Sequence, residues 1–282
     1  MPETHDSPDW YSLRHEATVL RLSKVFGMLA EKGIDALLIK GLAAARYHPD
    51  PSRRFSSDID VSISPKESVP FGELSSLLSG HAVDIHLGFK HLDNQAWDKV
   101  LSRSESFEVN GVKVKVPCRE DHIRILATHW LNDGGRRTDK LLDLVFCIEG
   151  AARDRGKEFD WELCLDGIGP VRRNWIAKAI GCLELFAGQH EVMHPFTGEE
   201  TSLPEWFVQT VRKEQLRENS PLAYSKSLGE FLKGVRTKFP PNPIQATIEG
   251  EVPFEESVPR LAQLKSFLRR IDHSVRTYIL GK

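Results

Sequence analysis

Three aspartates stand at positions whose spacing could hold divalent metal ions. Asp58 and Asp60 lie in the segment SSDIDVSI, and Asp84 lies in AVDIHL; both segments alternate polar and apolar residues as a strand does. Side chains two residues apart on a strand project to one face, so Asp58 and Asp60 are expected to converge, with Asp84 joining them from a neighbouring strand. Such oxygen ligands suit Mg²⁺ or Mn²⁺. Two ions held this way can clamp the attacking and leaving oxygens of a phosphoryl displacement.

An Asp-x-Asp pair has other uses, and the sequence separates some of them. A calcium loop that began at Asp58 would need Gly at its sixth position and Glu at its twelfth, where this chain has Ile63 and Val69. A calcium loop is therefore excluded. A glycosyltransferase that holds a sugar nucleotide through its metal stays open as an alternative, and it would need Asp58 and Asp60 but not Asp84.

The composition is that of an ordinary globular chain. Of the 282 residues 40% are hydrophobic and 28% are charged, with a formal net charge of −2, which argues against a fibrous or disordered protein. Without a basic tract, nucleic acid is a less favoured partner than a small molecule or a peptide, although a local basic patch would be compatible with it. The cysteines are widely spaced and predict buried reduced thiols in a cytoplasmic protein without signal peptide or membrane span: Cys118, Cys147, Cys164 and Cys182.

The first 118 residues predict a small mixed β-sheet flanked by helices. Helical periodicity runs from Trp10 to Lys32 and stops at Gly33, and a second short helix is expected from Phe71 to Leu78. Strands are expected in IDALLIKG, DIDVSI and AVDIHLGF, and FEVNGVKVKVP predicts a hairpin because Asn-Gly separates two alternating runs. The Lys40-Gly41 step ends the first of these strands in a tight turn.

The remaining residues, 119–282, predict a mainly helical domain that completes the active-site cleft, so the fold class is α+β. Apolar residues recur at helical spacing near Trp130, Val145 and Trp175, and again in one long stripe from Val258 to Tyr278 that Gly281 would cap. The Pro-rich segment KFPPNPIQATIEGEVP between them predicts a loop. The oligomeric state is left open.

Two of these segments resemble a known family. LLIKGLAAARYHPDPSRRFSSDIDVSI and VDIHLGF resemble nucleotidyltransferases of the DNA polymerase β superfamily, and within it a bacterial family catalogued as uncharacterised nucleotidyltransferases. One departure is Gly41-Leu42, where the superfamily often has Gly-Gly or Gly-Ser. The resemblance covers roughly residues 30 to 190, and the positions that carry it are Lys40, Gly41, Tyr47, Pro49, Arg54, Asp58, Asp60, Asp84 and His86.

The resemblance implies a role for each matching residue. Asp58 and Asp60 would hold an ion on a nucleoside triphosphate such as ATP. Asp84 would join them on a second ion and would also serve as the base for an acceptor hydroxyl. Lys40, Arg54 and the backbone amides after Gly41 would face the phosphates. His86 would contact a phosphate or the acceptor, or would only form a structural hydrogen bond.

The implied reaction transfers a nucleoside monophosphate to a hydroxyl acceptor and releases pyrophosphate. A small molecule or a protein side chain is favoured over RNA as the acceptor. A further alternative is a module that binds a nucleotide without catalysis, for example one half of a toxin–antitoxin pair.

Other polar residues and the tryptophans have simpler interpretations. His122 and His129 lie two helical turns apart and could reach toward the site, but ordinary helix residues are favoured. The Gly134–Arg137 turn could bind an anion, but a helix–helix turn with solvated arginines is favoured. The tryptophans in the helical segments are expected in the core: Trp130, Trp161 and Trp175.

Overall fold

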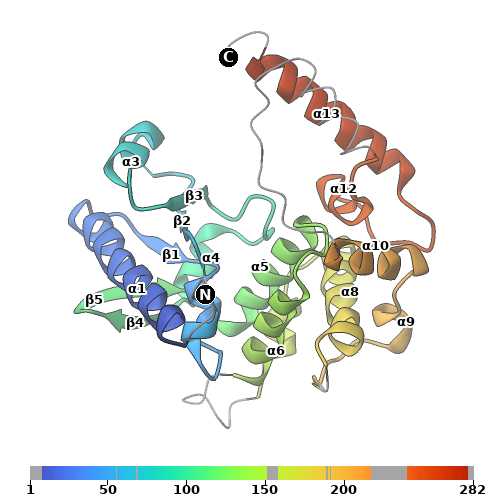
Figure 1. Cartoon of the computed structure of the whole chain (residues 1–282), viewed down its shortest axis with the longest axis horizontal. Helices are drawn as coiled ribbons and strands as arrows, with labels where there is room; N and C mark the ends of the chain where they lie inside the picture. Colours follow the sequence, from blue (N-terminus) through green and yellow to red (C-terminus); the bar gives the residue numbers. More distant parts are fainter. Residues whose placement is uncertain are drawn as a thin grey trace, which may run out of the picture. The chain divides into compact units, whose positions relative to one another are not determined.

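The computed structural model describes residues 8–54, 56–67, 69–150, 158–188, 190, 192–216 and 240–278. The chain divides into two compact units (Figure 1). Unit 1 comprises Met1–Leu126 and Leu142–Ile168, and unit 2 comprises Ala127–Leu141 and Gly169–Lys282. A single boundary after residue 118 was expected, whereas the chain passes between the compact units more than once.

Unit 1 is built on a five-stranded mixed sheet, within the residues that the structure describes, with strand order β3-β2-β1-β5-β4. β2 is antiparallel to β1 and parallel to β3, β1 is parallel to β5, and β5 is antiparallel to β4. This confirms a mixed α/β architecture. The strands are β1 (Ala36–Leu38), β2 (Ile59–Ile63), β3 (Val83–Leu87), β4 (Glu105–Val109) and β5 (Val112–Val116).

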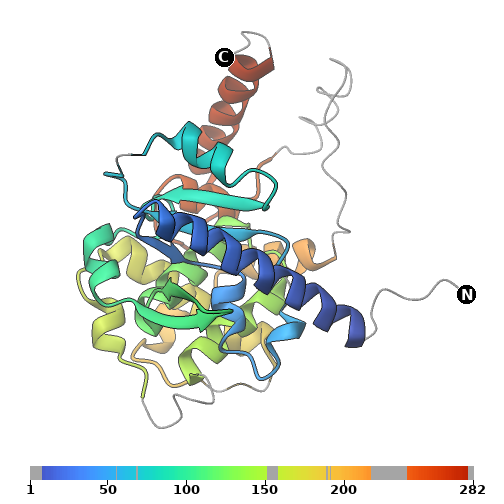
Figure 2. The ribbon, with the colours of Figure 1, turned by 90° about the vertical axis from the view of Figure 1, so that its left-hand side faces the viewer.

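Two apolar clusters form the core of unit 1. Helix α1 (Pro8–Glu31) runs across one face of the sheet, as Figure 2 shows, and buries Leu22, Val25 and Phe26 in a cluster with residues of the strands. A second cluster joins β1 to α4 (Trp97–Ser102) and α5 (Arg119–Asn132) through residues such as Trp97. The sheet is thus held between two apolar layers, which fixes the positions of β2 and β3.

Most elements that the sequence predicted for unit 1 are confirmed. The hairpin turns at Asn110 and Gly111, whose positive φ angles of 49° and 78° suit a two-residue loop. The predicted helix near Phe71 is α3 (Phe71–Leu77). Helix α4 was missed, since its six residues are too few to establish a helical period.

Unit 2 is helical in its described residues. It holds η2 (Thr138–Lys140), α8 (Pro170–Phe186), α9 (Gly198–Thr201), α10 (Glu205–Gln215), α12 (Pro243–Glu249) and α13 (Arg260–Tyr278). At Gly181 of α8, an added Cβ would meet the Thr201 carbonyl oxygen at 2.0 Å, so glycine is needed for the close packing of α8 and α9. The expected cap at Gly281 lies outside the described residues.

One prediction for unit 2 was wrong. The Pro-rich segment was expected to be a loop, but α12 occupies its middle. Pro243 stands in the first turn of α12, where its missing N–H costs nothing. The Asn242 side chain caps the helix by accepting from the Gln245 N–H at 3.1 Å, and Ile244 and Ile248 are buried. The prolines therefore start a helix here.

The other side-chain predictions are confirmed except for Trp161, which was expected in the core. The four cysteines are buried and free of disulfides, and Trp130 and Trp175 are each 1% exposed. Trp161, in α7 (Trp161–Leu165), is only partly buried and packs edge-on against Phe159 with the ring centroids 4.7 Å apart. Among the residues that the structure describes, no helix is both long and apolar enough to cross a membrane.

Candidate active site

Strands β2 and β3 bring three potential metal ligands together. The two strands are parallel, and their register aligns Asp60 with Asp84 and Ser62 with His86. One ligand atom each from Asp60, Asp84 and His86 lies within 4.8 Å of the other two. Asp60 is buried, His86 is half-buried and Asp84 is exposed, so the cluster is open to solvent on the Asp84 side.

Asp58 does not belong to this cluster. β2 begins at Ile59, so Asp58 precedes the strand, and its exposed carboxylate Oδ1 lies 3.4 Å from the Ser56 hydroxyl and 3.3 Å from the Ser57 hydroxyl. Asp58 therefore directly precedes the strand that carries Asp60, and the ligand atoms that lie within 4.8 Å of one another come from Asp60, Asp84 and His86.

Lys40 is the immediate partner of Asp60. Its ammonium Nζ lies 2.6 Å from Asp60 Oδ1, and both side chains are almost fully buried. The Ile39 N–H donates to the Asp60 carbonyl oxygen at 3.0 Å, which continues the β1–β2 pairing and sets Lys40 beside Asp60. Lys40 therefore places a positive charge at the inner wall of the cluster.

His86 has a buried nitrogen that lacks a hydrogen bond. His86 Nε2 lies 3.1 Å from Asp84 Oδ2 and 3.6 Å from Asp60 Oδ1, but neither approach has hydrogen-bond geometry. Burial lowers the pKa of His86, yet the carboxylates of Asp60 and Asp84 outweigh it and the pKa is raised. In turn His86 lowers the pKa of Asp84 more than burial raises it. The three groups therefore interact strongly through space.

The Lys40-Gly41 turn is held against the segment that leads into β2. Gly41 has φ +51°, and an added Cβ would lie 2.4 Å from Ser56 Oγ. Only glycine fits both the backbone angle and this close approach. Ser56 Oγ also donates to the Asp58 carbonyl oxygen at 2.9 Å. The helix that follows, α2 (Leu42–Ala45), has only four residues, so its dipole adds little to anion binding at the turn.

Arg54, expected at the phosphates, is instead bound to a buried carboxylate. Its Nε and Nη2 donate to the two oxygens of Asp143 at 2.6 and 2.7 Å, and His48 Nε2 lies 2.8 Å from Asp143 Oδ1. Asp143 belongs to α6 (Leu141–Glu149) and its side chain is 3% exposed. Burial would raise the pKa of Asp143, but His48 and Arg54 hold it below its ordinary value. This cluster ties the 46–58 segment to α6.

His122 is a core residue, as the simpler interpretation predicted. It is fully buried; its Nε2 lies 3.0 Å from the Ile39 carbonyl oxygen and its Nδ1 lies 3.3 Å from the Tyr47 hydroxyl. Burial lowers its pKa to about 3, so the ring is neutral. His122 therefore supports the end of β1 from behind, next to Lys40.

The remaining candidates lie in unit 2. His129 Nε2 is 3.5 Å from Asp133. In the Gly134–Arg137 turn, Arg136 pairs with Glu214 at 2.8 Å, and Arg137 pairs with Asp139 at 2.7 Å. Within the described residues both arginines are engaged with carboxylates, which fits the helix–helix turn better than an anion site.

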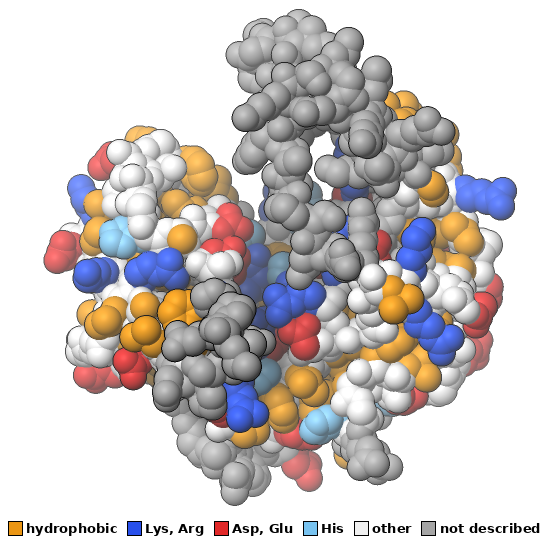
Figure 3. Space-filling view, viewed as in Figure 1, with side chains coloured by type: hydrophobic (Ala, Val, Ile, Leu, Met, Phe, Trp, Pro, Cys, Tyr) orange, Lys and Arg blue, Asp and Glu red, His pale blue; other side chains and the backbone are white. Residues whose placement is uncertain are grey.

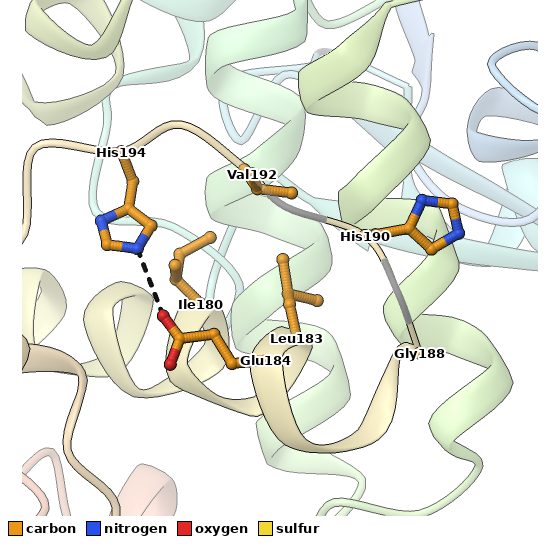
Figure 4. Close-up of a pocket in the computed structure, with 7 residues that line it drawn as sticks. All are labelled: Ile180, Leu183, Glu184, Gly188, His190, Val192 and His194. Carbon is orange, nitrogen blue, oxygen red and sulfur yellow. Dashed lines mark ion pairs between the residues drawn. The ribbon is translucent and has the colours of Figure 1, made fainter.

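Unit 2 also contains a hollow of about 630 Å³ beside the end of α8 (Figure 4). His194 Nε2 lies 3.6 Å from Glu184 Oε1, but the His190 ring points away from both (Figure 4). Because these groups do not converge, the hollow offers no metal or catalytic constellation among its described residues. Its lining comprises Ile180, Leu183, Glu184, Gly188, His190, Val192 and His194.

Comparisons with known proteins add no assignment: no family model, curated protein or solved structure matches the chain. The case for a site rests on its own chemistry. Two carboxylates and an imidazole converge, and the imidazole has a buried nitrogen without a hydrogen bond. This donor set fits a divalent cation.

Proposed function

We propose that the protein is a metal-dependent nucleotidyltransferase, which moves a nucleoside monophosphate from a nucleoside triphosphate to a hydroxyl acceptor. The observation that carries the proposal is the convergence of Asp60, Asp84 and His86 within 4.8 Å on two adjacent parallel strands. Lys40 and the Gly41 turn border the same cluster. Carboxylates beside a buried lysine are the groups that phosphoryl transfer needs for charge compensation.

Each residue has a distinct part in the proposed reaction. The acceptor oxygen attacks the α-phosphorus, the bond from that phosphorus to the bridging oxygen breaks, and pyrophosphate leaves. Asp84, which is exposed and ionised because its pKa is lowered, would take the acceptor proton. Lys40 would compensate negative charge on the non-bridging oxygens. A bound divalent ion would polarise the phosphate and acidify the acceptor hydroxyl.

The donor set also bears on the identity of the ion. Asp60 and Asp84 supply oxygens, which suit Mg²⁺ and Mn²⁺, whereas the His86 nitrogen favours a transition metal. Mn²⁺ satisfies both preferences better than Mg²⁺. The cluster offers one ligand atom from each of three residues, and a second ion would need further ligands, for which Asp58 is the candidate.

The surface supports a small acceptor or a peptide rather than nucleic acid. On the described part of the face drawn in Figure 3, lysines and arginines stand among acidic, apolar and other side chains. Nucleic acids need several Lys or Arg contacts to phosphates for useful affinity. The net charge of −2 agrees with this preference.

The test is to incubate the full chain with each labelled nucleoside triphosphate, Mn²⁺ or Mg²⁺, and a fractionated cell extract. We expect one triphosphate to yield pyrophosphate and a labelled adduct, with Mn²⁺ more effective than Mg²⁺ and no product after chelation. A variant in the same assay, Asp84→Ala, should yield none. Absence of product from all triphosphates and fractions would contradict the proposal and favour a module that binds nucleotide without catalysis.

The glycosyltransferase alternative makes a different demand on Asp84. An enzyme of that kind would rely on Asp58 and Asp60, and the exposed Asp84 carboxylate would be dispensable. The grouping of Asp60 with Asp84 and His86 supports nucleotidyl transfer, because it gives Asp84 a part in the site. Transfer from a sugar nucleotide with undiminished turnover in Asp84→Ala would support the alternative.

A further inference from the structure

The long C-terminal helix α13 carries an exposed row of leucines. Leu261, Leu264 and Leu268 are 66%, 51% and 56% exposed, although each is a large apolar side chain. Their spacing of three and then four residues puts them on one face of the helix. Single exposed leucines are normal on a surface, but an aligned row is a feature of interaction sites.

The opposite face of α13 packs against the rest of unit 2. Ala262 and Ser266 are buried at 9% and 1% exposure, and α13 packs against α12. Arg270 pairs with Glu249 at 2.8 Å, and Arg269 donates to the Glu249 carbonyl oxygen at 2.8 Å. These contacts hold α13 on unit 2 with the leucine row turned outward.

The spacing of the row is that of a coiled-coil seam. Leu261, Leu264, Leu268 and Ile271 alternate steps of three and four, and Val275 and Tyr278 continue these steps in the sequence. This is the a and d pattern of a heptad repeat, which is narrower than the apolar face of a helix that lies on a membrane. The pattern therefore calls for one partner helix.

We propose that the leucine row of α13 binds the same row of a second copy of this chain, with the two helices antiparallel. In an antiparallel pair the a and d layers alternate, so Leu268 of one chain lies opposite Ile271 of the other. That register puts Lys265 of each chain beside Asp272 of the other and forms two opposite-charge pairs. A parallel pair would instead oppose Lys265 with Arg260 of the other chain, which is repulsive.

The size of the seam limits the strength of the dimer. From Leu261 to Ile271 it covers about one and a half heptads, which is short for a coiled coil. The association should therefore be weak and should rise with concentration. It does not depend on the proposed activity, since α13 belongs to unit 2 and the metal cluster to unit 1.

The test is sedimentation equilibrium of the full chain over a wide concentration range. We expect the average mass to rise from 31.9 kDa toward twice that value. Leu264→Glu with Leu268→Glu should abolish the rise. A matched control, Leu185→Glu on α8, changes a leucine that is 57% exposed and should leave it unchanged. Circular dichroism should show that all variants keep their helix content.

A charge exchange tests the orientation. Lys265→Glu alone should weaken the dimer about two- to tenfold, because it opposes Glu to Asp272, and adding Asp272→Lys should restore it. In a parallel dimer the same Lys265→Glu would strengthen association through Arg260. The proposal would be overturned by a chain that stays monomeric at all concentrations, or by one that binds anionic vesicles without self-association. It would also be overturned if Lys265→Glu strengthened the dimer.

Discussion

Unit 1 holds two carboxylate clusters that share their chemistry but differ in how fully they are paired. Asp143 is 3% exposed, and both of its oxygens accept short bonds from Arg54, with His48 as a further partner. Asp84, in contrast, is 56% exposed and faces the imidazole of His86 without a good hydrogen bond. One cluster is saturated, and the other has unused ligand capacity.

The difference separates a structural from a reactive arrangement. A buried carboxylate whose two oxygens both accept charge-assisted hydrogen bonds is poorly placed to bind a further ligand, and removing one partner leaves an uncompensated charge. A cluster with an unsatisfied atom, here His86 Nε2, gains when a cation arrives and satisfies that atom. We therefore assign the Arg54 cluster to stability and place the proposed chemistry at the cluster of Asp60, Asp84 and His86. The variants below test that division, from the largest expected effect to the smallest.

The largest effect is expected from Asp84→Asn. The amide cannot take a proton and is a poor cation ligand, so turnover in the nucleotidyl-transfer assay should fall by about 10²–10⁴-fold. Urea unfolding should be almost unchanged, since Asp84 is exposed. The control is Glu108→Gln, an exposed carboxylate on β4, which should leave both quantities intact. Equal losses in the two variants would refute the assignment of Asp84.

Asp143→Asn should show the opposite pattern, with a large loss of folding stability and unchanged activity. It removes a buried charge from the Arg54 guanidinium and the His48 imidazole, so the free energy of unfolding should fall by about 3–5 kcal/mol, while the folded fraction keeps its activity. Urea denaturation followed by tryptophan fluorescence measures the loss. As a control, Asp35→Asn breaks the exposed Lys115 pair and should cost only about 0–1 kcal/mol. A small loss in Asp143→Asn would show that the cluster is not structural.

Lys40→Met tests a residue that shares features of both clusters. Lys40 is buried, as Asp143 is, but it pairs with Asp60 of the proposed metal cluster. Leaving Asp60 without its ammonium should cost about 3 kcal/mol of folding stability. Mn²⁺ should then raise the melting temperature of Lys40→Met more than that of the unaltered protein, since the ion can replace the lost charge. Equal shifts in both proteins would mean that the ion does not bind at Asp60.

Gly41→Ala tests the turn that borders the open cluster. The positive φ and the approach to Ser56 should make the alanine variant less stable by about 1–3 kcal/mol. Gly72→Ala in α3 is the matched control, since its Cβ would meet nothing within 4 Å. The control should be neutral or slightly stabilising. Chemical denaturation of both variants makes the comparison, and a stable Gly41→Ala would contradict the described turn.

The smallest effect is a pH dependence that Asp143 contributes. Its pKa is lowered in the folded protein, so its stabilisation is fully present above the unfolded pKa and is lost as pH falls through the folded pKa. Stability should therefore decline in acid, and the decline should be shallower in Asp143→Asn. Urea midpoints measured between neutral pH and pH 3 test this. If stability declined equally in Asp143→Asn and in the unaltered protein, other carboxyl groups would determine the loss of stability at low pH.

Local patterns predicted those parts of the site that depend on spacing. The alternation around Asp60 and Asp84 placed both on strands, and the strand register then brought them together. The start of β2 decides the position of Asp58, and spacing alone cannot fix a strand end to one residue. The partner of Arg54 lies 89 residues away in the chain, so no local pattern could reveal it.

Local patterns were also insufficient to predict two features of the helices in unit 2. The helical periodicity from Val258 to Tyr278 predicted the apolar stripe of α13, but not that Leu261, Leu264 and Leu268 are exposed. Helix α12 was missed because Pro243 and the neighbouring prolines suggested a loop, although the Asn242 cap and a buried Ile248 are typical of a helix start and its inner face. Burial depends on tertiary packing, which a local pattern does not contain.

The central claim is that Asp60, Asp84 and His86 hold a divalent ion, and an electron paramagnetic resonance titration of the full chain with Mn²⁺ tests it most directly. We predict saturable binding of one ion that is lost in Asp84→Asn and retained in Glu108→Gln. Binding that is equal in the two variants, or absent from the unaltered protein, would contradict the claim.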